Sequence, residues 1–131
     1  MELKYKPLSE FDDITIKQIL QFGTIEEMII LPLSIGQHNP NWKYAQDICV
    51  KLSNHDDERV RANAALGLAY TARTKGKLEK HIVKPVLLKL LNDCTEYRWR
   101  IIDAIEDINL FMKWRIAEKA IEKYNTVHAD M

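Results

Sequence analysis

The run from Asp56 to Ala65, DDERVRANAA, decides the predicted fold because it joins a turn to the start of a helix. Its acidic residues at 56–58 suit the unpaired N–H groups in the first turn of a helix. Apolar side chains then recur at spacings typical of one helix face, at Val60, Ala64, Ala65, Leu68 and Ala72. Small alanines on that face allow a neighbouring helix to approach closely. The predicted helix ends at Lys75-Gly76-Lys77.

The same pattern returns later in the chain. Asp93 and Arg98 each lie 37 residues after Asp56 and Arg61. An offset of this size is within the range of helical solenoid repeats. The second copy departs from the first at Tyr97 and Ile101, which replace a valine and an alanine. We therefore expect its helices to lie further apart.

This repeated run resembles the HEAT-repeat signature, in which a turn aspartate precedes a helix that opens with valine-arginine. The resemblance covers about residues 41–110, and residues 14–35 could form a degenerate first pair. It implies an all-α fold, a short α-solenoid of about three antiparallel helix pairs. It also implies that two aspartate–arginine pairs tie one repeat to its neighbour: Asp56 with Arg61, and Asp93 with Arg98.

Capping signals on both sides of this run predict about seven helices. Gly23 should stop a first helix, and Thr24 with Glu27 forms a capping box for a second that runs to about Gly36. Asn39-Pro40 should open the third. The later helices are expected near 56–75, 82–91, 97–110 and 113–124. We interpret residues 1–131 as one helical-repeat domain, with an extended arm at 1–10 and a frayed tail at 125–131.

Composition restricts the function and the compartment. Lysine plus arginine equals aspartate plus glutamate at 19 each, which argues against a general nucleic-acid coat. Cys49 and Cys94 form no C-x-x-C motif and are expected to be reduced thiols. The N-terminus lacks the apolar core of a signal peptide, and the longest apolar stretch, 28–35, is too short to span a bilayer. We therefore expect a cytoplasmic, unanchored protein.

The sequence carries little sign of catalysis. Its four glycines are scattered, so no phosphate-binding loop is present. Its four histidines are far apart and predict no metal site. Cys49 falls on an apolar helix face, where cysteine usually packs as a small hydrophobic residue. We predict no cofactor and no enzyme activity.

Two features keep other functions open. Trp99 and Asp103 lie one helical turn apart, an arrangement similar to that of HEAT-like alkylpurine DNA glycosylases, although this chain is short and neutral. The alternative is a tryptophan at an interface beside a solvated aspartate. The stretch 73–89 holds six basic residues and one acid, and could form a patch for RNA, DNA or an acidic protein. Without interleaved aromatics, an ordinary solvated surface is the favoured interpretation.

The spacing of the repeat also predicts a binding surface beside the core stripe. On the first repeat this ridge consists of Arg59, Asn63, Leu66, Tyr70 and Arg73, and on the second of Glu96, Arg100, Asp103, Asp107 and Leu110, with Trp99 beside it. Aromatic residues and arginine carry most of the energy in protein interfaces. Asp103, Glu106 and Asp107 could attract a basic partner.

The favoured function is therefore a non-catalytic protein-binding module. A small neutral helical domain is similar to bacterial immunity proteins, which neutralise a toxin by occupying its active site or substrate surface. The expected partner is a protein, with a basic toxin or a nuclease domain as the favoured candidates. The alternatives are a HEAT-like DNA glycosylase and a nucleic-acid-binding protein.

Overall fold

The computed structural model describes residues 9–129, which fold entirely into helices and connecting turns, so that the predicted all-α class is confirmed. Residues 1–8 of the expected arm lie outside the described residues. The helices are α1 (Asp13–Phe22), α2 (Ile25–His38), α3 (Trp42–Leu52), α4 (Glu58–Lys75), α5 (Lys80–Asp93), α6 (Arg98–Met112) and α7 (Glu118–Ala129).

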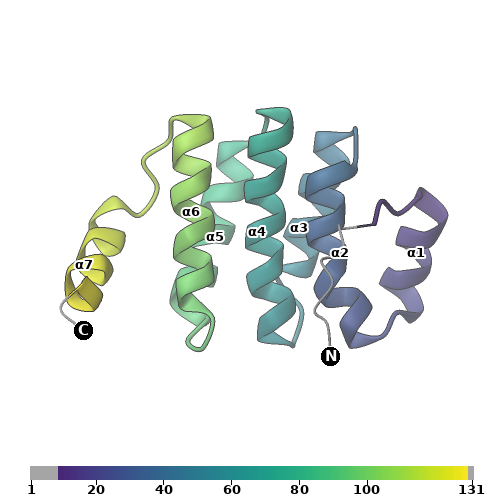
Figure 1. The fold of residues 1–131 in the computed structure, drawn as a ribbon, viewed down its shortest axis with the longest axis horizontal. Coiled ribbons are helices and arrows are strands. Elements are labelled where there is room, and N and C mark those ends of the chain that lie inside the picture. The colour runs from purple at the N-terminus through teal and green to yellow at the C-terminus, as the bar shows by residue number, and fades with distance from the viewer. Residues whose placement is uncertain (1–8, 130–131) are drawn as a thin grey trace, which may run out of the picture.

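The helices form two rows. Helices α2, α4 and α6 stand side by side in one row, with α3 and α5 behind them and α1 and α7 at opposite ends (Figure 1). Helix α4 is central and packs against α2, α3, α5 and α6. One apolar cluster lies among α1–α4 and a second extends from α3 and α4 to α7. Because α4 contributes to both clusters, it is buried on most of its circumference.

Two glycines set the closest approach between α2 and α4. A Cβ atom added at Gly67 would lie 2.5 Å from the carbonyl oxygen of Pro32 and 2.6 Å from Sγ of Cys49. A Cβ atom added at Gly36 would lie 2.3 Å from the carbonyl oxygen of Gly67. Real atoms do not come so close, so these two helices meet backbone against backbone.

Local capping signals predicted several helix ends. Glu27 N–H donates to Oγ1 of Thr24 over 3.2 Å, and the Glu27 carboxylate accepts from Thr24 N–H over 2.9 Å, so the capping box is confirmed. The prediction that Asn39-Pro40 opens α3 is wrong. The Asn39 side chain accepts from the N–H of Asn41, and Asn41 itself caps α3. The helix therefore begins two residues later than predicted.

The predicted start of the last helix, near residue 113, is also wrong. Lys113 and Ala117 adopt left-handed backbone conformations with φ of 57° and 54°, and they interrupt the chain between α6 and α7. The Asn109 side chain holds this connection by pairing with both backbone polar groups of Ile116. Residues 125–129, expected to fray, belong to α7.

No helix within residues 9–129 combines the length and the apolarity that a membrane crossing requires.

Candidate functional site

The predicted binding residues lie on α4 and α6, the neighbouring helices in the row of Figure 1. Most of them are accessible: Arg59, Asp103 and Asp107 are exposed, Trp99 is 48% exposed, and Tyr70 and Arg100 are half-buried. We call these six residues the α4/α6 ridge.

Asn63 was predicted to belong to this surface, and that prediction is wrong because its side chain is only 3% exposed. Its Nδ2 atom donates to the carbonyl oxygen of Ile29 on α2 over 2.7 Å. Its Oδ1 atom accepts from Nη1 of Arg100 on α6, also over 2.7 Å. Asn63 therefore links three helices beneath the ridge.

Arg100 connects this buried link to the surface. Its guanidinium carbon lies 5.1 Å from the ring centre of Trp99 and 5.2 Å from that of Tyr97. A guanidinium that contacts two rings and hydrogen-bonds a buried amide has little freedom to move. The Trp99 indole is thus held at the surface, with half of its area exposed.

At the start of α4, Arg59 is bound to its own helix cap. Its Nε and Nη2 atoms donate to the two carboxylate oxygens of Asp57 over 3.1 and 2.8 Å. These hydrogen bonds lower the pKa of Asp57 to about 2. Asp57 also accepts from the backbone N–H of Arg59 over 2.8 Å as the N-cap of α4. The cap and the arginine therefore stabilise each other.

Near the C-terminal end of α4, the predicted binding surface contacts α2. The guanidinium of Arg73 lies 4.7 Å from the ring centre of Tyr70 and donates to Oε1 of Gln37 over 2.9 Å. The Tyr70 ring is therefore covered on one side by a cation.

The exposed side of α6 is acidic. Asp103, Glu106 and Asp107 are all exposed, and within residues 9–129 none of them forms an ion pair. This face can therefore attract a positively charged surface.

The predicted ties between repeats differ in detail from the structure. Nη1 of Arg61 donates to the carbonyl oxygens of His55 and Asp56, both over 2.8 Å. Arg98 likewise binds carbonyl oxygens, of Leu91 over 3.1 Å and of Asn92 over 3.5 Å. Arg61 thus fastens the turn between α3 and α4, and Arg98 fastens the end of α5. Both bind backbone carbonyls where aspartate carboxylates were predicted, and Arg61 also lies 4.0 Å from the Glu58 carboxylate.

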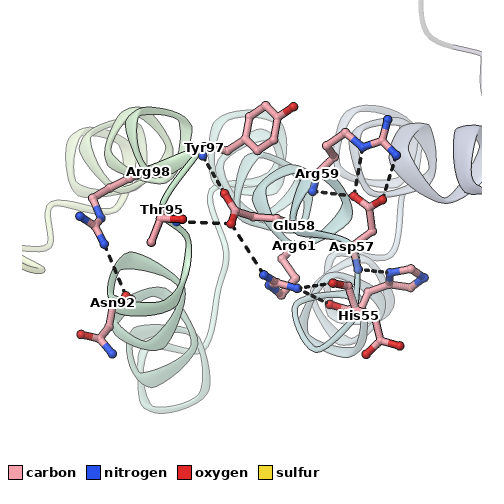
Figure 2. A network of polar contacts seen from close by, with 10 residues as sticks. His55, Asp57, Glu58, Arg59, Arg61, Asn92, Thr95, Tyr97 and Arg98 are labelled. Carbon is pink, nitrogen blue, oxygen red and sulfur yellow. Dashed lines mark hydrogen bonds and ion pairs between the residues drawn. The ribbon is translucent and has the colours of Figure 1, made fainter.

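Glu58 makes the link between neighbouring pairs instead (Figure 2). Its carboxylate accepts from the N–H of Tyr97 over 2.7 Å and from the N–H of Thr95 over 3.4 Å, at the start of α6. The turns before α4 and α6 therefore lie side by side at one end of the molecule. The only sequence feature near this link is the acidic run 56–58, and it predicts the start of α4 without indicating the contact with α6.

The residues considered for catalysis or metal binding do not converge on one site in the described part of the chain. Burial raises the pKa of Cys49 to about 12, and Cys94 is also buried. No three His, Cys, Asp or Glu side chains converge as metal ligands anywhere in the described part of the chain. Trp99 and Asp103, the glycosylase-like pair, are exposed on the side of α6.

Basic side chains of the stretch 73–89 make contacts in several parts of the molecule. Arg73 contacts Gln37 on α2, and Lys89 donates to Oδ1 of Asn54 beyond α3 over 3.3 Å. Lys80 lies 5.7 Å from the ring centre of Trp114, in the connection that precedes α7. Arg73, Lys80 and Lys89 therefore contact three different parts of the molecule.

Comparison with known proteins identifies a solved structure of similar fold. No protein-family model and no curated protein matches the sequence. Among solved structures, the chain is similar to one in the crystal structure of the CDI complex from Cupriavidus taiwanensis LMG 19424, with a TM-score of 0.72 and 20% sequence identity. The match covers 84% of this chain and 98% of that chain. The two chains therefore share a fold over nearly the whole length of the matched one.

Proposed function

We propose that this protein is a non-catalytic immunity protein, which neutralises a bacterial toxin in the cytoplasm by covering its active site with the α4/α6 ridge. The observation that carries the proposal is the fold shared with a chain of a CDI complex, a contact-dependent inhibition system, over 98% of that chain.

The ridge has the composition of a protein interface. Trp99 offers a large apolar surface that Arg100 already holds in place, so little side-chain entropy is lost when a partner covers it. Asp103 and Asp107 supply negative charge on the same helix, and no cation of residues 9–129 forms an ion pair with either. If the toxin is a nuclease, these carboxylates would occupy a basic cleft that otherwise binds phosphates.

The same geometry offers less to the glycosylase alternative. An enzyme that acts on a base encloses it in a fitted pocket and places its carboxylate against the sugar. Asp103 is instead exposed on the side of a helix, next to a half-exposed tryptophan. A surface of this kind suits occlusion of another protein better than catalysis.

The decisive experiment begins with the reading frame directly upstream of this gene, which is expected to encode the cognate toxin domain. Purified protein and toxin domain are expected to form a tight one-to-one complex by calorimetry, and cells that express both should survive. A protein complex with an apolar anchor keeps most of its affinity in high salt, whereas nucleic-acid binding falls steeply. A toxin domain that remains fully active with excess protein present would contradict the proposal.

A further inference from the structure

The connection between α6 and α7 turns the last helix away from its neighbour. Lys113 and Ala117 take left-handed conformations, and Asn109 fixes the intervening turn through two hydrogen bonds of 2.9 and 3.0 Å to Ile116. Side-chain amides that bind both backbone groups of one residue hold a turn firmly. Helix α7 is therefore set at a distance from the exposed side of α6.

A hollow of about 750 Å³ opens between the two helices. Leu110, which is 71% exposed, and the buried Ile121 contribute apolar lining. Three carboxylates also line the hollow, Glu106 from α6 and Glu118 and Glu122 from α7. Apolar and acidic groups thus meet in one concave surface.

Two of these carboxylates have no ion-pair partner in the part of the chain that the structure describes. The third, Glu118, accepts from Nε of Arg115 over 2.9 Å. Glu106 and Glu122 are exposed, and no cation from residues 9–129 pairs with either. A bound cation would therefore gain their attraction without first displacing another one.

The hollow continues the α4/α6 ridge. Trp99, Asp103, Glu106 and Leu110 follow one another at spacings of four, three and four residues, which places them along one side of α6. A partner that covers Trp99 and continues along α6 would reach the hollow at Leu110.

We propose that this hollow receives a basic amphipathic segment of the protein partner, an inference that rests on the proposed function and specifies the chemistry of the toxin surface. Its lysine or arginine head groups would lie at Glu106 and Glu122, and their aliphatic stems would cover Leu110 and Ile121. Lysine and arginine combine such stems with a charged head in one side chain. A nucleic acid does not fit, since its phosphates would be repelled by the carboxylates.

The first test needs no toxin. The probe is a short synthetic helical peptide with lysines on one face and leucines on the other, titrated into isotope-labelled protein and followed by NMR. We expect chemical-shift changes concentrated in residues 103–125, and a loss of at least tenfold in peptide affinity in the double variant Glu106→Gln/Glu122→Gln. The matched control Glu10→Gln/Asp56→Asn removes the same charge elsewhere and should bind like the wild type. Shift changes spread over all helices, or equal affinity in the two double variants, would overturn the inference.

The second test uses the toxin domain and separates this inference from the proposed function. The Glu106→Gln/Glu122→Gln variant should associate at least fivefold more slowly than the control variant, and its rate should depend less on salt. If the toxin binds tightly and the two variants associate equally fast, the immunity function stands and the docking site is wrong. If no toxin binds but the peptide result holds, the basic segment belongs to another protein partner.

Discussion

The Oδ1 atom of Asn63, buried in α4, accepts a 2.7 Å hydrogen bond from Nη1 of Arg100 on α6. Its amide nitrogen donates over the same distance to the carbonyl oxygen of Ile29 on α2. One side chain thus joins the three helices of the front row and fixes the residue that supports Trp99.

Replacing Asn63 by alanine should therefore destabilise the protein. The change removes two hydrogen bonds of the nearly buried Asn63 amide, one to the Ile29 carbonyl and one to Arg100, which costs about 1–3 kcal/mol in the free energy of unfolding. Urea denaturation followed by circular dichroism measures this loss. Asn125→Ala, at an exposed position on α7, is the control and should stay within about 0.5 kcal/mol of the wild type. Equal stability of the two variants would show that the Asn63 link is not formed.

The contact between α2 and α4 gives a second prediction. In Gly67→Ala the new methyl group meets the Pro32 carbonyl oxygen at 2.5 Å, so the two backbones must separate. Overpacking of this kind costs about 1–3 kcal/mol. Adding Cys49→Ala removes the sulfur at 2.6 Å but leaves the carbonyl in place, and it should not restore stability. Denaturation midpoints of the single and double variants decide; an unchanged midpoint in Gly67→Ala would contradict the close packing.

The Asp57–Arg59 pair makes a small part of the stability dependent on pH. Hydrogen bonds from Arg59 lower the folded-state pKa of Asp57 from 3.8 to about 2. A carboxyl group whose pKa is lowered by folding stabilises the protein above its unfolded pKa, and this contribution disappears as the pH falls through the folded value. Wild type should therefore exceed Asp57→Asn by at most about 1 kcal/mol at neutral pH, since Arg59 is half exposed.

Thermal unfolding between pH 2 and pH 7 checks this prediction. The difference between wild type and Asp57→Asn should be constant above about pH 5, shrink below pH 4 and nearly vanish at pH 2. A difference that persists unchanged at pH 2 would mean that the carboxylate charge is not its cause.

Those features that depend on neighbouring residues in the chain could be predicted from the sequence. Gly23 and the Thr24–Glu27 capping box act within a few residues, and both helix ends lie where they were expected. The start of α7 depends on Asn109, which binds Ile116 across the connection and stabilises two left-handed residues. No local pattern indicates that pairing.

The α4/α6 ridge also combines features that local sequence predicts with features that depend on distant residues. Helical spacing predicts that Asn63 lies on the same side of α4 as Arg59 and Tyr70, and the three residues do belong to that helix. The burial of Asn63 follows from the approach of α2, which Gly36 and Gly67 permit, and that contact joins residues far apart in the sequence. Glu58 was missed for the same reason, because its acceptor role concerns N–H groups at the start of α6.

Trp99 provides the sharpest test of the proposed interface. Its indole is 48% exposed, so Trp99→Ala should change the stability of the free protein little. A tryptophan at the centre of an interface typically contributes at least about 2 kcal/mol, which corresponds to roughly a 30-fold loss of affinity for the toxin domain. Phe22→Ala is the matched control, because Phe22 is 79% exposed on α1, at the other end of the molecule from α6 and α7 (Figure 1).

The substitution Arg100→Lys tests whether Arg100 acts by holding the Trp99 indole in place. Lysine keeps the positive charge but lacks the planar group that contacts two rings and Asn63. If the preorganised indole matters, Arg100→Lys should weaken toxin binding while Trp99 is still present, and it should add little once Trp99 has been replaced by alanine. Affinities of the four proteins in this cycle, measured by calorimetry, decide between the two cases. Additive effects of the two changes would mean that Arg100 contacts the toxin independently of Trp99. If toxin affinity falls in Phe22→Ala but not in Trp99→Ala, the interface lies on α1.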